Sequence, residues 1–181
     1  LFDILIVVYC GMKEDIMTVR EMMEALGLAA DEEAAGKLTE YNAMLMEMNK
    51  KVNLTGIKDT EESLVKNVYD SMTVYNEKYF PRDGRILDLG TGGGFPGIPL
   101  AVLRPDMQVV LMDSVLKKLN FIESAAAKLE IKNVKIMHMR AEEGGRRRKT
   151  RESFDVVTAR AVKMLPVIAE WAMPFVKVGG I

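Results

Sequence analysis

Residues 88–97 read Asp-Leu-Gly-Thr-Gly-Gly-Gly-Phe-Pro-Gly, and this stretch decides the fold. It overlaps the end of a short apolar run at 85–89 and precedes a helical segment at 99–103. Glycine fills four of the five positions 90–94, and glycines let a backbone turn tightly and approach a ligand closely. In a parallel α/β sheet, ligands bind at such a turn, beyond the carboxyl end of the strand. The stretch therefore predicts a ligand-binding loop at the edge of a parallel sheet.

The spacing of the glycines fits two classes of ligand. In the first class, Gly92, Gly94 and Gly97 match the G-x-G-x-x-G pattern of dinucleotide-binding enzymes. Asp113 follows Gly92 by 21 residues, close to the distance expected for a carboxylate that binds the ribose. This interpretation makes the chain a nicotinamide-dependent oxidoreductase.

The second class is S-adenosylmethionine, for which the pattern is Asp88, Gly90, Gly92 and Gly94 at alternate positions. Asp88 lies at the end of the strand, two residues before the first glycine. A carboxylate there repels a pyrophosphate but can hold an ammonium group, directly or through water. S-adenosylmethionine carries an ammonium and a sulfonium and no phosphate, so the local chemistry favours it. Asp113 suits ribose hydroxyls in either class.

Downstream of residue 84 the chain alternates between apolar runs and helical patterns. Expected strands cover 85–89, 108–112, 133–137 and 154–158, and expected helices cover 99–103, 114–129 and 161–175. Strands joined by crossover helices form right-handed βαβ units and a parallel sheet covered on both faces. The fold class is therefore α/β with a mainly parallel, Rossmann-like sheet. In the helix over 114–129, the residues expected to face inward are Leu116, Leu119, Ile122 and Ala126.

Upstream of residue 84 the chain has helical patterns. The spacing of apolar residues predicts helices over 14–26, from Asp31 onward, and from a capping box at 59–62 to Tyr75. The turn Pro-Arg-Asp-Gly at 81–84 separates these helices from the sheet. We therefore divide the chain into an N-terminal helical cap, residues 12–83, and a sheet domain, residues 84–181, which form one compact unit.

The two ends of the sequence are unusual. The chain begins at Leu1, and residues 1–11 are apolar without the features of a signal peptide, so we interpret them as an extension ahead of Met12. At the other end an apolar segment is just beginning at Ile181. It predicts a fifth strand, with the C-terminal strands of the sheet missing from this chain.

Composition narrows the range of functions. The 181 residues include 25 Lys and Arg against 26 Asp and Glu, a formal net charge of −1, which argues against bulk, non-specific nucleic-acid binding. Cys10 and His138 are the single cysteine and histidine, so an internal disulfide, a metal site with several histidines and a two-histidine mechanism are excluded. No apolar run reaches the length of a membrane span.

Three further segments carry candidate site residues. Ala141 and Glu142 follow the third expected strand, where a small contact and an acceptor can hold an adenine, although acids are also common in a first helical turn. Arg160 follows the fourth strand, at the mouth of the same crevice, where its planar fork suits a carboxylate or a phosphate. Residues 146–149, Arg-Arg-Arg-Lys, either engage RNA phosphates or form a solvated loop.

Taken together and in order, these motifs resemble the glucose-inhibited division protein B family, also called ribosomal RNA small-subunit methyltransferase G. The resemblance runs from about Leu38 to Gly180. The chain departs from the family at one position. The family usually has a Lys-His pair, and here Lys66 is followed by Asn67 instead of a histidine. The matching segments are NKKVNLT at 49–55, DLGTGGGFPGIPL at 88–100, MDS at 112–114, RAEE at 140–143, RAV at 160–162 and PFVKVGG at 174–180.

The resemblance implies a class I S-adenosylmethionine-dependent methyltransferase with a helical cap, which we expect to be a cytoplasmic monomer. It implies methyl transfer to N7 of one guanine in 16S ribosomal RNA, with the small ribosomal subunit as partner. The residues expected to bind the cofactor are Asp88, Gly90, Gly92, Gly94, Phe95, Asp113, Ala141, Glu142 and Arg160. The residues expected to contact RNA are Lys66, Arg146, Arg147, Arg148 and Lys149, with Arg160 a candidate for positioning the substrate.

This reaction suits a chain that has one histidine. Guanine N7 has a lone pair and no proton, so attack on a sulfonium methyl needs no general base, and alignment and desolvation can supply the catalysis. N7 lies on the Hoogsteen edge, so the base has to be unpaired or splayed out of a helix. The nicotinamide-dependent oxidoreductase and a non-catalytic cofactor-binding fragment remain as alternatives.

Overall fold

A parallel sheet lies at the centre of the molecule. The computed structural model describes residues 17–29 and 31–181, so the expected extension over 1–11 lies outside the described residues. The strands β1 (Arg85–Leu89), β2 (Gln108–Asp113), β3 (Val134–His138) and β4 (Val156–Ala159) pair in the order β3-β2-β1-β4, each pair parallel. Beside β4, the Ile181 N–H donates to the Asp155 carbonyl at 2.9 Å, and the Ile181 carbonyl accepts from the Val157 N–H at 2.8 Å. The predicted α/β fold with a parallel sheet is confirmed.

Among the residues that the structure describes, four α-helices and one π-helical turn precede the sheet, and we call this region, with its loops, the cap. These elements are α1 (Val19–Ala25), α2 (Glu32–Asn49), and a continuous stretch of α3 (Thr60–Ser63), the π-helical turn η1 (Leu64–Tyr69) and α4 (Asp70–Thr73). Capping side chains explain where three of them begin. Thr18, Asp31 and Asp59 each accept a backbone N–H from the first turn that follows. Among the described residues, no helix combines the length and apolar character that a membrane crossing requires.

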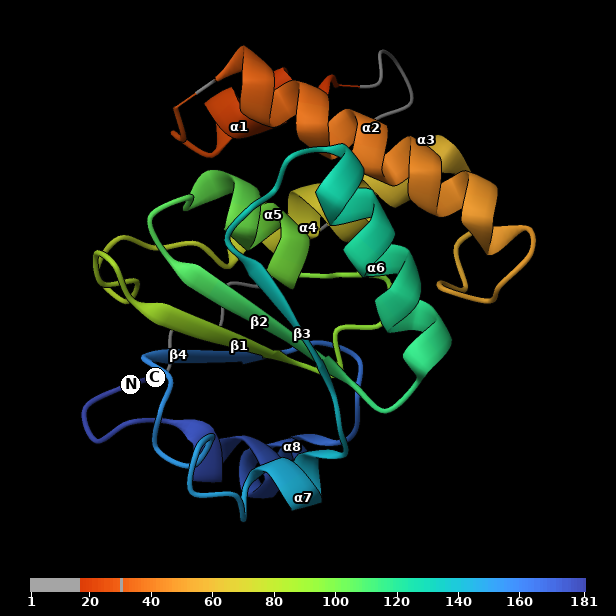
Figure 1. Ribbon diagram of the computed structural model, residues 1–181. Helices are drawn as coiled ribbons and strands as arrows, with labels where there is room; N and C mark the ends of the chain where they lie inside the picture. The colour runs from red at the N-terminus through yellow and green to blue at the C-terminus, as the bar shows by residue number, and fades with distance from the viewer. Residues whose placement is uncertain (1–16, 30) are drawn as a thin grey trace.

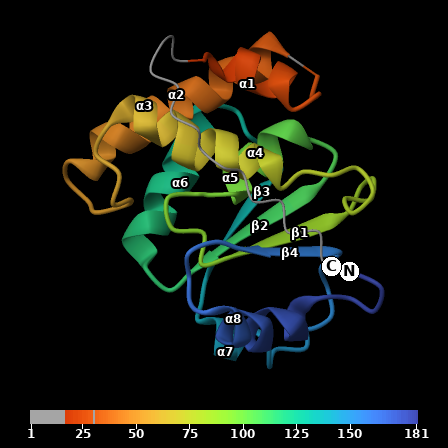
Figure 2. The same cartoon turned by 180° about the vertical axis from the view of Figure 1, so that it is seen from behind.

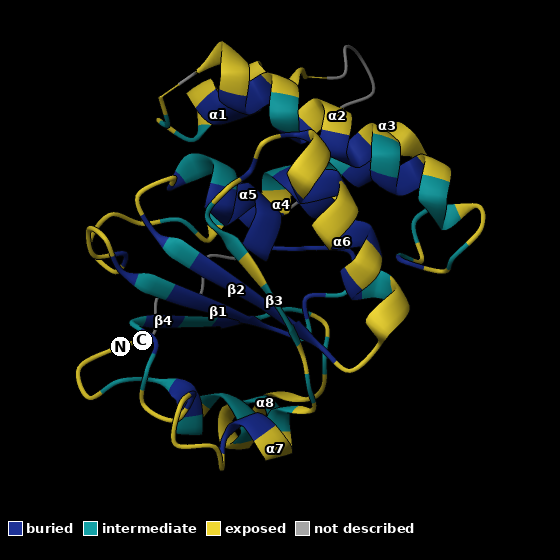
Figure 3. Cartoon of the chain, in the orientation of Figure 1, coloured by how far each residue is buried: buried dark blue, intermediate teal, exposed yellow. Residues whose placement is uncertain are grey.

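The helices form one layer on each face of the sheet. The cap, α5 (Gly97–Leu103) and α6 (Leu116–Lys128) cover one face, and α7 (Ala141–Gly144) and α8 (Leu165–Ala172) cover the other (Figures 1 and 2). A short 3-10 helix, η2 (Met173–Phe175), follows α8. Figure 3 shows β1 and β2 almost entirely buried between these two layers, whereas the edge strand β3 is intermediate to exposed.

Alternate residues of each strand pack into two separate hydrophobic clusters. Ile86 points toward the cap, whereas Leu87 and Leu89 point toward α8, where they meet Phe154 and Phe175. The cluster on the cap side is continuous from Val19 in α1 to Val156 in β4, so the cap and the sheet share one core.

Two details of the expected helices are wrong. The helix expected over 161–175 begins only at Leu165, because Pro166 lacks an N–H and fits the first turn, where no partner is needed. Ala161 instead has a left-handed φ of 54°, which no regular helix contains. Leu116, expected to face inward, is the first residue of α6 and is 50% exposed. The other expected strands and helices are present, with ends shifted by a few residues.

Candidate functional site

The glycine-rich segment forms a tight loop between β1 and α5. Gly90, Gly92 and Gly94 all have positive φ values, of 70°, 58° and 94°. A Cβ added at Gly94 would collide with the Tyr41 hydroxyl of α2, so a side chain is excluded there by contact as well as by conformation. A Cβ at Gly92 would meet no atom closer than 3.9 Å. The backbone at Gly92 is therefore the part of the loop that a ligand can approach.

Asp88 fixes the shape of this loop by accepting hydrogen bonds from it. Its side chain is fully buried, and its Oδ2 accepts hydrogen bonds from the Thr91 hydroxyl at 2.6 Å and the Gly97 N–H at 2.9 Å. Its Oδ1 accepts from the Thr158 hydroxyl of β4 at 2.9 Å. Burial raises the pKa of Asp88, and these hydrogen bonds oppose that shift. Both oxygens are thus engaged by the protein, which suits a residue that shapes the loop better than one that contacts an ammonium group directly.

Asp113 joins the end of β2 to the same loop. Its Oδ2 accepts from the Gly92 N–H at 2.9 Å, and its Oδ1 accepts from the Val115 N–H at 2.8 Å. The carboxylate therefore lies against the accessible part of the loop, at the carboxyl edge of the sheet, where a ribose partner was expected. Each Asp113 oxygen accepts one hydrogen bond from the protein and has capacity for a second, which a ligand hydroxyl can fill.

A pocket of about 470 Å³ opens beside the glycine loop. Residues 54–57 of the cap, η1 and the ends of β1 and β4 enclose it. Three cationic side chains line it, those of Lys66, Lys118 and Arg160, and the lining residues include no carboxylate. The predicted site residues that it brings together are Gly90, Gly92, Phe95, Lys66 and Arg160.

The other predicted site residues lie elsewhere. Asp88 and Gly94 are buried behind the loop, and Asp113 touches it from β2. Ala141 and Glu142 begin α7, after β3. The exposed loop of Arg146, Arg147, Arg148 and Lys149 lies between α7 and β4, on the opposite side of the sheet from the cap (Figure 1). None of these residues lines the pocket.

Arg160 crosses from the end of β4 to the cap. Its guanidinium donates to the Lys66 carbonyl at 2.7 Å, to Oδ1 of Asn67 at 2.8 Å and to Oδ2 of Asp70 at 2.9 Å. It also lies over the Phe95 ring, 5.6 Å from the centroid. The three acceptors lie within or directly after η1, so this turn is built around the arginine.

Buried polar residues fix the Asn67 amide, and the sequence interpretation missed them. The Asn67 amide donates to the Ser63 hydroxyl at 3.0 Å, which donates to Oδ1 of Asn42 at 2.6 Å. The Asn42 amide in turn donates to the Thr60 carbonyl at 3.0 Å. This series of hydrogen bonds orients Oδ1 of Asn67 toward Arg160. A polar Asn42 beside the apolar stripe of α2 was the available sequence signal.

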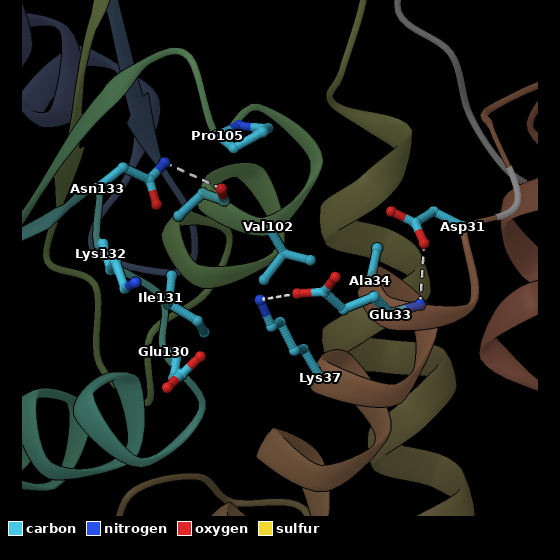
Figure 4. A pocket seen from close by; sticks show the side chains of 11 residues that line it. Asp31, Glu33, Ala34, Lys37, Val102, Pro105, Glu130, Ile131, Lys132 and Asn133 are labelled. Atoms are coloured by element: carbon cyan, nitrogen blue, oxygen red, sulfur yellow. Dashed lines mark hydrogen bonds and ion pairs between the residues drawn. The ribbon is translucent and has the colours of Figure 1, made fainter.

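A second hollow, of about 310 Å³, lies at the opposite end of the sheet (Figure 4). It is formed by the start of α2 and by the segments that precede β2 and β3. Lys37 forms an ion pair with Glu33 at 2.6 Å, and the Asn133 amide donates to the Ala101 carbonyl at 3.0 Å. Because it lies near the amino ends of the strands, it is not where a parallel sheet binds its ligand.

The family of the chain follows from its match to a family model. Residues 34–181 match the model described as rRNA small subunit methyltransferase G. The chain belongs to this family. The ribosomal RNA small subunit methyltransferase G of Clostridium perfringens (strain 13 / Type A) is 39% identical over 162 residues, which cover 90% of this chain and 68% of that protein. That of Alkaliphilus metalliredigens is 40% identical over 167 residues, 92% of this chain and 70% of that protein.

Solved structures of other methyltransferases share the fold of this chain. The O-methyltransferase TomG of Streptomyces achromogenes has a TM-score of 0.51 and 21% identity over 90% of this chain and 68% of that chain. Coclaurine N-methyltransferase has a TM-score of 0.53 and 12% identity over 90% of this chain and 55% of that chain. At such identities the likeness concerns the fold alone.

Proposed function

We propose that this chain transfers a methyl group from S-adenosylmethionine to N7 of a guanine in 16S ribosomal RNA. The observation that carries the proposal is the cationic pocket beside the glycine loop, in a chain of the rRNA methyltransferase family. The pocket lies at the carboxyl edge of a parallel sheet, where such folds bind their ligands. Of its three cations, Lys66 is paired with Glu62 at 2.5 Å and Arg160 with Asp70 at 2.9 Å, and both carboxylates lie outside the lining. Cationic groups in this position can exchange such partners for the phosphates of RNA. The nicotinamide-dependent oxidoreductase is set aside, because the family transfers methyl groups.

The residues divide between two tasks. The Gly92 backbone and Asp113, with Ala141 and Glu142 at the start of α7, lie along the ends of β1, β2 and β3, and we assign to them the binding of the methyl donor. Arg160 and Lys66 lie on the β4 side, where the substrate base enters. Asp88 acts through the loop that it holds, and we assign it a positioning role.

Catalysis in this proposal consists of alignment. When bound, S-adenosylmethionine supplies a methyl group on a positively charged sulfur. The N7 lone pair forms the new C–N bond while the S–C bond breaks and its electron pair stays on sulfur, so no proton is removed. The chain therefore needs to hold two reactants in line and exclude water, and it needs no general base. The monomeric state and the cytoplasmic location stay predictions.

The decisive experiment is tritium transfer from methyl-labelled S-adenosylmethionine to small ribosomal subunits from a strain that lacks the modification. We expect label in 16S rRNA, recovered as 7-methylguanosine after digestion, and none in fully modified subunits. Calorimetry with S-adenosylhomocysteine and with NAD supplies the controls. Binding of S-adenosylhomocysteine without label transfer would indicate a cofactor-binding fragment, and saturable binding of NAD alone would restore the oxidoreductase.

A further inference from the structure

The loop between α2 and α3 has a fixed shape. Asn49, the last residue of α2, makes four hydrogen bonds to it. Its Oδ1 accepts from the N–H groups of Leu54 at 2.8 Å and Thr55 at 3.0 Å, and its amide donates to the carbonyls of Thr55 and Ile57, both at 3.0 Å. Leu54 is buried in the core. These hydrogen bonds fix the conformation of the loop backbone, and therefore the positions from which its other side chains extend.

Three of those side chains are lysines, Lys50, Lys51 and Lys58, which we call the cap-loop lysines. All three are exposed. Within residues 17–29 and 31–181, none of them has an ion pair or a side-chain hydrogen bond, whereas Lys37 is paired with Glu33. Holding unpaired positive charges close together costs electrostatic free energy, which a polyanion bound at the surface would offset.

Two of the cap-loop lysines, Lys50 and Lys58, line a hollow next to the glycine-loop pocket. The loop forms a ridge between that pocket and a neighbouring hollow of about 850 Å³, and Thr55 and Gly56 line both. Lys50 and Lys58 line the neighbouring hollow, where Glu47 is the one carboxylate among the lining residues. In both views of the fold this loop lies beside the start of α6, which adds Lys117 and Lys118 (Figures 1 and 2). Lys50 and Lys58 in one hollow and Lys66 and Lys118 in the other thus bring cationic side chains to both sides of this ridge.

We propose that the cap-loop lysines, with Lys117 and Lys118, bind the phosphate backbone of the RNA strand that enters the glycine-loop pocket. The proposal rests on the proposed function, because it places the RNA substrate of that same site. Lysine ammonium groups act as point charges on phosphates, so this surface supplies affinity and orientation and reads no bases. The loop at 146–149, which the sequence favoured as an RNA contact, lies on the other side of the sheet and does not border the pocket.

The test compares the parent chain with the triple variant Lys50→Gln, Lys51→Gln, Lys58→Gln. Binding to 16S rRNA is measured from about 0.05 to 0.2 M salt. Each lost phosphate contact makes the negative slope of log K against log salt shallower by about 0.7 to 0.9, so we expect the slope to become shallower by about two and the affinity to fall by about tenfold. We expect the KM for ribosomal subunits to rise, and kcat at saturating subunits and affinity for S-adenosylhomocysteine to stay unchanged.

The matched control is Lys78→Gln, Lys132→Gln, Lys135→Gln, which removes the same charge from exposed lysines that line neither the glycine-loop pocket nor the hollow of about 850 Å³. With this control variant, the slope of log K for 16S rRNA against log salt should equal that of the parent chain within experimental error. Equal losses in the two variants, or a loss found only in Arg146→Gln, Arg147→Gln, Arg148→Gln, would overturn the proposal, as would a parent chain that does not bind the RNA. Lysine-dependent RNA binding without methyl transfer would instead refute the proposed function and leave the RNA surface standing.

Discussion

At Arg160, a single guanidinium joins the end of β4 to the cap through three hydrogen bonds in the range 2.7–2.9 Å. One acceptor is the Asn67 oxygen, whose direction is set by the buried hydroxyl of Ser63. Another is Asp70, which is half exposed. Because these bonds hold the side chain in place, the proposed contact of Arg160 with RNA would cost little conformational entropy.

We predict that Arg160→Lys lowers kcat/KM for ribosomal subunits by at least about tenfold, because an ammonium group cannot reproduce a planar set of hydrogen bonds. Affinity for S-adenosylhomocysteine should change by less than about twofold, since the arginine lies on the β4 side of the pocket. Methyl-transfer kinetics and calorimetry measure the two effects. Arg82→Lys, at an exposed arginine outside the pocket, is the control. Loss of cofactor affinity in step with activity would contradict a substrate role for Arg160.

At the scale of elements, two irregular segments form the site, and both are held by α2. The π-helical turn η1 places the Lys66 carbonyl, Asn67 and Asp70 toward Arg160, a recurring use of π turns at functional sites. The glycine loop is held by Tyr41, whose hydroxyl donates to the Gly93 carbonyl at 2.8 Å. A regular helix or a longer loop would lose these contacts.

We predict that Gly94→Ala destabilises the chain by about 2–5 kcal/mol, because it combines a left-handed φ with overlap against the Tyr41 hydroxyl. It should also weaken binding of S-adenosylhomocysteine. The matched control is Gly36→Ala in α2, where an added Cβ meets nothing within 4 Å, and there we expect a gain of about 0.5–1 kcal/mol. Urea denaturation measures both. A Gly94→Ala chain as stable as the parent would show that the loop tolerates side chains.

The sequence predicts the elements better than the contacts between them. Strands such as β1 and β2 are predictable because short apolar runs lie between turn signals, and the glycine loop is predictable because its residue types serve few other purposes. The π turn is not, because an apolar stripe in η1 does not distinguish i+4 from i+5 hydrogen bonding. The partners of Arg160 lie 90 to 94 residues away, so they depend on how the cap docks on the sheet.

At the scale of the whole molecule, the cap and the sheet behave as one body in their packing. Tyr41 of α2 meets Phe95 of the glycine loop and Phe121 of α6, with ring centroids 5.8 and 5.7 Å apart. Arg104 fastens the connection between cap and sheet by donating to the carbonyls of Phe80 at 2.9 Å and Pro81 at 3.0 Å. Because the two parts share this core, we predict that they unfold as a single cooperative unit.

This packing predicts that a destabilising substitution in the cap also lowers the stability of the α7 and α8 layer on the other face of the sheet. Leu38→Ala removes a side chain that is 1% exposed in α2, and we expect a loss of about 2–5 kcal/mol. Trp171 in α8, the single tryptophan of the chain, reports by fluorescence from the opposite side of the sheet. Fluorescence and far-ultraviolet circular dichroism should shift together, by about 5–15 °C in the midpoint.

The control is the same substitution at an exposed leucine, Leu116→Ala, which should cost less than about 0.5 kcal/mol. If Leu38→Ala lowers the circular dichroism midpoint while the Trp171 midpoint stays in place, the cap and the α8 layer unfold separately. The Arg160 contacts could then break while the rest of the sheet stays folded. Coincident transitions would mean instead that Arg160 and the glycine loop keep their positions as long as the chain is folded, because the cap that holds them cannot leave alone.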